Sequence, residues 1–236
     1  MKQSKISASL AVVIPAYNEA ENIRTILKNT LKSLPNYFKD YEIIVVNDGS
    51  TDKTGKIADQ IAKRNKSVRV IHQSNGGYSQ AMLAGIKASK KEFVAYMPAD
   101  GQFLVDDMRH CFEVMKGADL VLGYRGGRSD YATRRIFFSY GYLLLLLLLF
   151  DIKYMDVGWV NIWRTSKIKR IPMRYTGGIF LLTEILVRFK QKKYKIIEAP
   201  SYYHPRIAGE VKNAKLKVVR QTFQSALQLW YEIKFK

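Results

Sequence analysis

Short apolar runs alternate with helical patterns over the first hundred residues of this 236-residue chain. The apolar runs lie at 10–14, 42–46, 68–72 and 93–97, and the helical patterns lie near 19–33, 53–64 and 78–89. Strands that are apolar along their whole length belong to parallel sheets covered by helices on both faces. The order therefore predicts an α/β fold with a mostly parallel central sheet. Further strands are expected at 118–124 and 195–199.

One of these runs ends in a carboxylate. Asp100 follows the run at 93–97, and the amide side chain of Gln102 comes two residues later. Open α/β sheets bind ligands in the crevice beyond the carboxyl ends of their strands. Asp100 is therefore the first candidate to bind a metal ion or a phosphate group.

Other polar residues follow the first two strands. Pro15 is expected to end the first strand, which puts Tyr17 and Glu19 at the crevice. Tyr17 can stack on a base and Glu19 can accept from a ribose or base, although Glu19 can also merely complement a helix dipole. Asp48 ends the second strand and can accept a nucleobase N–H; alternatively, Asp48 or Ser50 caps the next helix.

The charge and the cysteine content narrow the partners. The 39 Lys and Arg against 20 Asp and Glu give a net charge of +19, which attracts nucleic acid, anionic lipid or phosphorylated substrates. Nucleic acid is not expected, because the basic residues are spread out and no nucleic-acid-binding motif occurs. P-loop and dinucleotide fingerprints are missing as well. The single cysteine, Cys111, is expected in the core and favours a reducing compartment, and no export signal is recognised.

Two later segments fit either the core or a membrane surface. Residues 136–150 include seven consecutive leucines, which is short for a membrane span and fits a buried helix or an interfacial one. Residues 213–236 combine basic residues with an apolar stripe, which fits an amphipathic helix on an anionic membrane or a helix packed on the sheet. The stripe consists of Leu216, Val219, Phe223, Leu227, Trp230 and Ile233.

Four motifs carry a family resemblance. They occupy 12–19, 43–52, 75–85 and 99–102, and in this order they resemble the nucleotide-sugar half of family 2 glycosyltransferases. The chain is most similar to dolichol-phosphate mannose synthase and other polyprenyl-phosphate glycosyltransferases. The resemblance implies a single GT-A domain over 1–212, with a nucleotide-sugar half at about 8–125 and an acceptor half at about 126–212. The amphipathic helix at 213–236 would follow it.

The resemblance also implies roles for single residues. The family holds Mg²⁺ or Mn²⁺ with an Asp-x-Asp-x-Gln signature, which falls here on Pro98, Asp100 and Gln102. Metal ligands are thus expected at Asp100 and Gln102, in a site weakened by the missing first aspartate, because Mg²⁺ typically takes one or two carboxylates beside phosphate oxygens and waters. Nucleotide-sugar binding falls on Pro15, Tyr17, Glu19, Val46, Asp48, Ala99, Asp100, Arg125, Arg206 and Lys212.

Three residues are candidates for catalysis by the same resemblance. Asp156 and Glu184 compete for the catalytic carboxylate, and Arg206 would stabilise the charge that builds on the leaving group. A lipid-phosphate acceptor reduces the need for a base, because a phosphate monoester with its second pKa near about 6 is largely a dianion at neutral pH.

The sequence thus predicts a metal-dependent, inverting transferase that moves a sugar from a nucleoside-diphosphate sugar to a polyprenyl or dolichyl phosphate. It would lie peripherally on the cytoplasmic, inner face of an anionic membrane, and a membrane partner subunit is among the partners considered. The alternatives are a family 2 enzyme acting on a polysaccharide or another soluble acceptor, and a degenerate homologue without catalysis.

Overall fold

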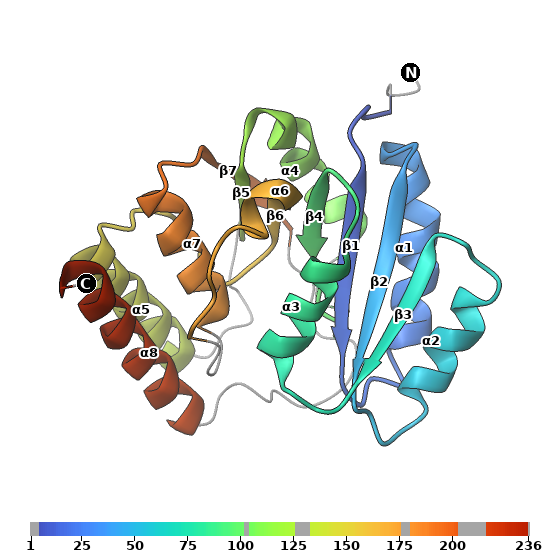
Figure 1. Ribbon diagram of the computed structural model, residues 1–236, viewed down its shortest axis with the longest axis horizontal. Coiled ribbons are helices and arrows are strands. Elements are labelled where there is room, and N and C mark those ends of the chain that lie inside the picture. The colour runs from blue at the N-terminus through green and yellow to red at the C-terminus, as the bar shows by residue number, and fades with distance from the viewer. Residues whose placement is uncertain (1–4, 102–103, 126–132, 176–179, 203–215, 236) are drawn as a thin grey trace.

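The computed structural model describes residues 5–101, 104–125, 133–175, 180–202 and 216–235 (Figure 1). One seven-stranded sheet runs through this part of the chain in the order β3-β2-β1-β4-β6-β5-β7. The strands are β1 (Leu10–Ala16), β2 (Tyr41–Asp48), β3 (Val68–Gln73), β4 (Phe93–Tyr96), β5 (Leu120–Arg125), β6 (Asn161–Arg164) and β7 (Ile196–Ser201). Only β6 is antiparallel to its neighbours, so the mostly parallel sheet is confirmed.

Helices cover both faces of the sheet. They are α1 (Ile23–Tyr37), α2 (Thr54–Ala62), α3 (Tyr78–Ala88), α4 (Arg109–Val114), α5 (Thr133–Phe150), α6 (Thr165–Ile168), α7 (Leu181–Gln191) and α8 (Leu216–Phe235), with short 3-10 turns η1 (Val105–Met108) and η2 (Met115–Gly117). Apolar residues of α1, α2 and α4 pack in the core on one face. Those of α3, α5, α7 and α8 pack in the core on the other face.

The sequence of β1 explains how one strand serves both cores. Leu10, Val12 and Ile14 belong to the core under α1, whereas Ala11 and Val13 belong to the core under α3. Successive side chains of a strand point to opposite faces, so a run without polar residues must be covered on both sides. The α/β fold class predicted from the apolar runs follows from this alternation.

The expectation that Pro15 ends the first strand is wrong. The strand β1 continues to Ala16, and Pro15 pairs in register with Val46 of β2. The pairing of β1 with β4 ends where the carbonyl of Val13 accepts a hydrogen bond from the amide of Met97. Residues alternate in the side to which they bond, so Pro15 faces the side on which β4 has already ended. Its missing N–H therefore costs no ladder bond.

Other boundaries also differ from the prediction. The first helix begins at Ile23 and not near residue 19, because the amides of Asn22 and Ile23 both bond the carbonyl of Glu19 in a preceding turn. The antiparallel strand β6 was not predicted, since its four residues carry too little pattern. The expected strands at 118–124 and 195–199 correspond to β5 and β7.

The leucine run of helix α5 is partly buried and partly exposed. Leu146 is fully buried in the core, whereas Leu144 and Leu148 are exposed, Leu148 at 74%. No helix in the described part of the chain is long and apolar enough to cross a membrane.

The apolar stripe of the C-terminal helix, expected either on a membrane surface or packed on the sheet, is partly exposed and partly packed. In α8, Phe223 and Leu227 are exposed, and the buried side chains are Thr222, Ser225, Ala226 and Leu229. Ile233, which also belongs to the stripe, packs partly buried against the core. The proposed division into two halves and a terminal helix stays a prediction.

Candidate functional site

The carboxyl ends of β1, β2, β3, β4 and β5 meet at one edge of the sheet, at the bottom of Figure 1. Four of these strands carry predicted site residues into the turns that follow them. The residues lie in four groups, around Asp48, Glu19, Asp100 and Arg125.

The carboxylate of Asp48 is buried and holds the turn after β3. Its Oδ1 accepts hydrogen bonds from Gln73 Nε2 at 2.7 Å and from the amide of Gly76 at 2.9 Å. Its Oδ2 accepts from the amide of Gly77 at 2.9 Å. Asp48 thus shapes the glycine turn that leads into α3, a contact that the sequence did not reveal. The side chain of Val46 is buried in the core, which leaves only its main chain to meet a nucleoside.

Neither Asp48 nor Ser50 caps α2, which corrects the alternative interpretation of the second motif. Asp52 instead binds the first residue of α2, since its Oδ1 accepts from the amide of Thr54 at 2.9 Å and from the Thr54 hydroxyl at 2.5 Å. These hydrogen bonds hold the pKa of Asp52 below its ordinary value, although desolvation by burial opposes them. Ser50 Oγ accepts from the amide of Asn18 at 3.1 Å.

The first two motifs are joined by hydrogen bonds. The amide of Glu19 donates to Thr54 Oγ1 at 2.8 Å, and the amide of Thr51 donates to Asn18 Oδ1 at 2.9 Å. Asn18 adopts a left-handed φ of 52°, which an asparagine tolerates. The Tyr17 ring is exposed beside this turn. The turns after β1 and β2 are therefore hydrogen-bonded to each other, and together they form the preshaped rim that carries Tyr17 and Glu19.

Asp100 lies near a buried pair of tyrosines. Tyr78 from the start of α3 and Tyr96 from the end of β4 are in edge contact, with ring centroids 5.6 Å apart. Burial raises the pKa of Tyr96; the hydrogen bond from Tyr78 and the charge of Arg125 lower it, and the charge of Asp100 raises it. The charges of Asp100 and Arg125 thus act on the Tyr96 hydroxyl in opposite directions.

Arg125 is held on two sides. Its Nε and Nη2 donate to the two carboxylate oxygens of Asp156 at 2.6 Å and 3.0 Å. Its guanidinium carbon lies 4.8 Å from the centroid of the Trp159 ring. Two nearly parallel bonds and an aromatic face fix an arginine far better than one contact does. The sequence suggested separate roles for Arg125 and Asp156 but not their pairing.

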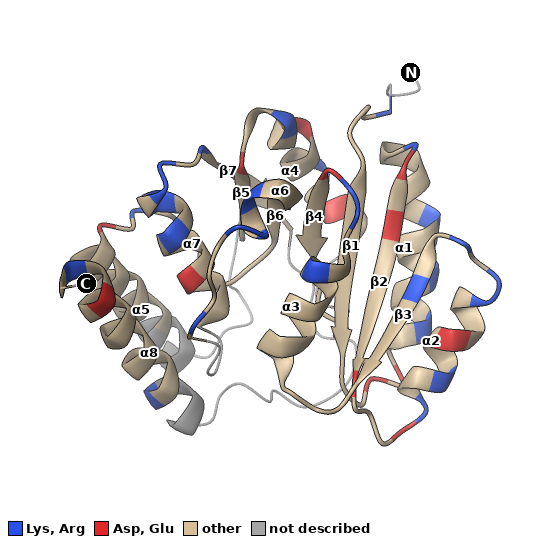
Figure 2. Ribbon diagram, viewed as in Figure 1, with Lys and Arg blue, Asp and Glu red and all other residues tan. Residues whose placement is uncertain are grey.

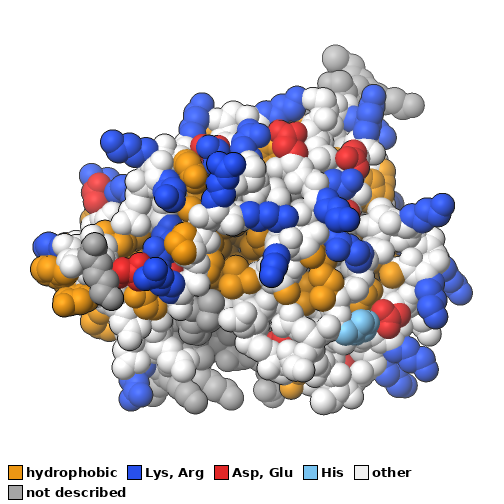
Figure 3. All heavy atoms as spheres, in the orientation of Figure 1, with side chains coloured by type: hydrophobic (Ala, Val, Ile, Leu, Met, Phe, Trp, Pro, Cys, Tyr) orange, Lys and Arg blue, Asp and Glu red, His pale blue; other side chains and the backbone are white. Residues whose placement is uncertain are grey.

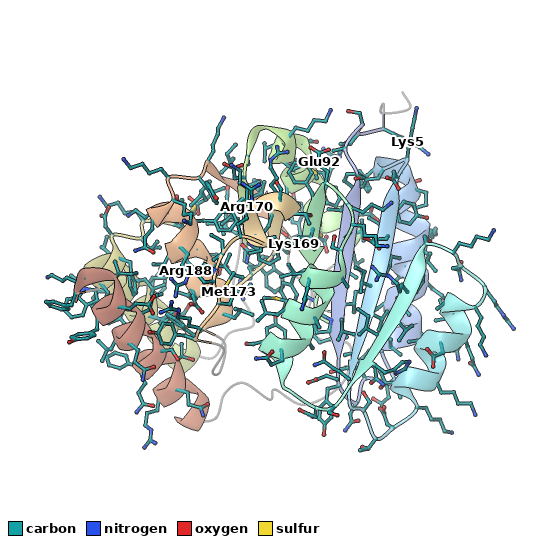
Figure 4. All side chains as sticks on the ribbon, in the orientation of Figure 1. Lys5, Glu92, Lys169, Arg170, Met173 and Arg188 are labelled. Atoms are coloured by element: carbon teal, nitrogen blue, oxygen red, sulfur yellow. The ribbon has the colours of Figure 1, made fainter. Side chains whose placement is uncertain are left out.

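Glu184, the other candidate catalytic carboxylate, is fully buried at 0% exposure. Its oxygens accept from the amides of Arg174 and Tyr175 at 3.0 Å and 2.9 Å and from Arg188 Nε at 2.8 Å. Arg188 also lies 3.3 Å from a carboxylate oxygen of Glu232 on α8. Figure 4 shows Arg188 on the side of α7 that faces α8. Glu184 thus ties α7, the segment before residue 176 and α8 together.

The predicted metal site is only partly within the described residues. Asp100 lies in the turn after β4, and Pro98 offers no side-chain ligand. No group of three or more His, Cys, Asp or Glu side chains that could hold a metal occurs in the part of the chain that the structure describes. One carboxylate at the sheet edge fits a cation that takes its other ligands from phosphates and waters. Gln102, Arg206 and Lys212 lie outside the described residues.

Comparisons with known proteins bear on this edge of the sheet. Residues 11–170 match the family model described as glycosyl transferase family 2. The undecaprenyl-phosphate 4-deoxy-4-formamido-L-arabinose transferase of Edwardsiella ictaluri is 33% identical over 138 residues, which cover 57% of this chain and 42% of that protein. Glycosyltransferase AglD of Haloferax volcanii is 26% identical over 243 residues, 95% of this chain and 37% of its own. The chain therefore spans about two fifths of these relatives.

A solved structure shares the fold. The glucosyl-3-phosphoglycerate synthase of Mycobacterium tuberculosis, in complex with Mn²⁺, UDP and phosphoglyceric acid, superposes with a TM-score of 0.73 at 16% identity. The match covers 94% of this chain and 78% of that one.

Proposed function

The chain belongs to glycosyl transferase family 2, and we propose that it transfers a sugar from a nucleoside-diphosphate sugar to a polyprenyl phosphate at a membrane surface. The observation that carries this proposal is that Asp100 follows β4 and the Arg125–Asp156 ion pair lies at the end of β5, both at the carboxyl edge of the sheet. A carboxylate for a cation and a guanidinium for phosphate oxygens are the two groups that a nucleotide diphosphate requires.

The donor half of the proposal uses the preshaped rim. Tyr17 is exposed and available to stack on a base, and Glu19 lies beside it. Asp100 and Gln102 would hold Mg²⁺ or Mn²⁺, which would neutralise the diphosphate of the leaving group. Arg125, Arg206 and Lys212 would add positive charge, the last two as sequence expectations. Catalysis would then come mainly from positioning and from charge stabilisation.

The acceptor half rests on the outer faces of α5 and α8. Exposed Leu144 and Leu148 on α5 accompany exposed Phe223, Leu227 and Tyr231 on α8, and the two helices are in contact. Lys234 lies 5.0 Å over the Trp230 ring at the end of α8. Figure 3 shows hydrophobic side chains at the end of the molecule where Figure 1 places the C-terminus. Apolar, aromatic and basic residues on one helix suit the surface of an anionic membrane.

The family relatives support the acceptor class. The transferase of Edwardsiella ictaluri is named for undecaprenyl phosphate, and a phosphate monoester acceptor is consistent with a site whose two candidate carboxylates, Asp156 and Glu184, are both engaged in ion pairs. We place the protein on the cytoplasmic face, because nucleotide sugars are expected there by the same resemblance.

The donor is tested by thermal stabilisation with UDP- and GDP-sugars in the presence of Mg²⁺ or Mn²⁺, followed by transfer of labelled sugar to polyprenyl phosphate. A ligand at a hundredfold excess over its Kd stabilises by about 2.7 kcal/mol. The proposal fails if no nucleoside diphosphate binds and Asp100→Ala leaves transfer unchanged. Binding without transfer would instead identify a degenerate homologue, for which the missing first aspartate at Pro98 is the observation.

The membrane part is tested separately by flotation with vesicles containing anionic lipid. Leu148→Glu is expected to reduce flotation several-fold, because it places a charge in the proposed apolar face. Met155→Glu is the matched control, since Met155 is also exposed but lies outside both helices. Transfer to a soluble acceptor together with equal flotation of both variants would favour the polysaccharide alternative.

A further inference from the structure

We propose that Asp156 is a positioning residue, which holds the guanidinium of Arg125 against Trp159 as a preset binding group for a phosphate of the substrates. Asp156 would then not be the base that takes a proton from the acceptor. The inference rests on the proposed function, because it concerns the same edge of the sheet, and it assigns a different role to a residue that the sequence made a catalytic candidate.

The carboxylate of Asp156 accepts hydrogen bonds from several donors of the protein. Its Oδ2 accepts from Arg125 Nε at 2.6 Å, and its Oδ1 accepts from Arg125 Nη2 at 3.0 Å and from the amide of Gly158 at 3.2 Å. Both oxygens therefore already serve donors on the protein. A base must offer a lone pair to the proton that it takes from the acceptor, and protonation here would break the ion pair that compensates Arg125.

Both side chains of the Arg125–Asp156 ion pair are shielded from solvent. The side chain of Asp156 is 5% exposed and that of Arg125 is 11% exposed. A buried ion pair is costly to break, since removal of one charge leaves the other without compensation. The arginine is thus held in one orientation, which lowers the entropy lost when it binds a ligand.

An aromatic ring supports the guanidinium of Arg125 from one face. The Arg125 guanidinium lies over the Trp159 ring, and Trp159 Nε1 donates to Ser201 Oγ at 3.4 Å. Ser201 ends β7 and pairs in register with Arg125, which ends the neighbouring strand β5. The loop carrying Asp156 is therefore anchored to the sheet through the same tryptophan that supports the arginine. Loop, strand and ring together fix one cation at the carboxyl edge.

The opposite edge of the sheet provides a matched control. Arg164 Nη1 bonds Glu92 at 3.0 Å, and the Arg164 guanidinium lies 4.6 Å over the Phe93 ring. The same three chemical groups are thus assembled at the start of β4 and the end of β6, and Figure 4 shows Glu92 near the top of the molecule, away from the carboxyl ends. Glu92→Gln should leave the substrate constants unchanged.

The test is steady-state transfer kinetics with each phosphate substrate varied in turn. Arg125→Gln is expected to raise one KM by about tenfold to a hundredfold, in line with one lost charged bidentate contact. Asp156→Asn should raise the same KM. The double variant should be no worse than Arg125→Gln alone, because both changes remove the same oriented guanidinium. A rise in the KM of the nucleotide sugar identifies the donor diphosphate as the partner, and a rise in that of the lipid phosphate identifies the acceptor.

Other kinetic outcomes would overturn the positioning role of Asp156. If Asp156→Asn lowers kcat a hundredfold or more, abolishes the acid limb of the pH profile and leaves both KM values unchanged, Asp156 is a base and the inference is overturned. Additive effects in the double variant would overturn it too. If Asp156→Asn does not fold, Trp159→Leu decides, since loss of the ring must raise the same KM as Arg125→Gln. If the wild type neither binds a nucleoside diphosphate nor transfers sugar, the proposed function itself fails.

Discussion

Glu184→Ala should destabilise the protein strongly, because the Glu184 carboxylate compensates a buried cation. Arg188 is buried beside it, and the amides of Arg174 and Tyr175 would also lose their acceptor. Removing one partner of a buried ion pair costs about 3–5 kcal/mol. Arg188 keeps Glu232 at 3.3 Å, so we expect the lower end, about 3 kcal/mol.

The assay is urea unfolding followed by circular dichroism, with the free energy of unfolding compared at equal m-value. The control is Glu113→Ala, which breaks a solvent-exposed pair with Arg109 at 3.4 Å and should cost under about 1 kcal/mol. A Glu184→Ala variant as stable as the wild type, but without transfer activity, would refute the structural role and restore Glu184 as a catalytic candidate. Retained activity in folded Glu184→Ala would exclude Glu184 from catalysis.

Three further predictions follow from buried or crowded groups. Burial raises the pKa of the Cys111 thiol to about 12, so a thiol reagent at pH 8 should react only after unfolding. Gly85→Ala should cost about 1–2 kcal/mol in chemical unfolding, because its Cβ would lie 2.2 Å from a side-chain carbon of β1. Burial would raise the pKa of Glu232, but the Tyr175 hydrogen bond and the charge of Arg188 bring it below its ordinary value. A carboxylate with a lowered pKa stabilises the folded protein above its ordinary pKa, and this stabilisation is lost as the pH falls through the lowered value. Glu232→Gln should therefore cost stability at pH 7 and little at pH 3.

The fold was largely predictable because β1, β2 and β4 contain buried apolar runs and β3 contains an apolar run that is partly buried. A strand buried on both faces leaves a strong signal in the sequence, and each was found within about three residues of its observed bounds. The antiparallel β6 has only four residues, and its neighbours β4 and β5 lie far from it in sequence. Its pairing is decided by long-range contacts, for which a local pattern carries no signal.

The site was predictable in its residue types but not in its contacts. Asp48 was singled out at a strand end, and Arg125 and Asp156 by the family resemblance, yet nothing in their spacing shows that Asp48 binds the glycine turn or that Arg125 pairs with Asp156. Such pairs join positions about 30 residues apart, and they depend on how the loops close over the sheet. The same holds for Glu184, whose partners come from the segment before residue 176 and from α7.

The missing first aspartate changes what the rest of the site must do. Where two carboxylates hold a cation, they also oppose the negative charge of a diphosphate, and the cation offsets both. Pro98 removes one of these negative charges, so a nucleotide would meet a site that is less repulsive even before a metal binds. The remaining Asp100 would bind a divalent cation more weakly, and a larger share of the charge neutralisation would fall on fixed protein cations. Arg125, held by Asp156 and Trp159 at the carboxyl edge of the sheet, is a described cation whose orientation is set for that task.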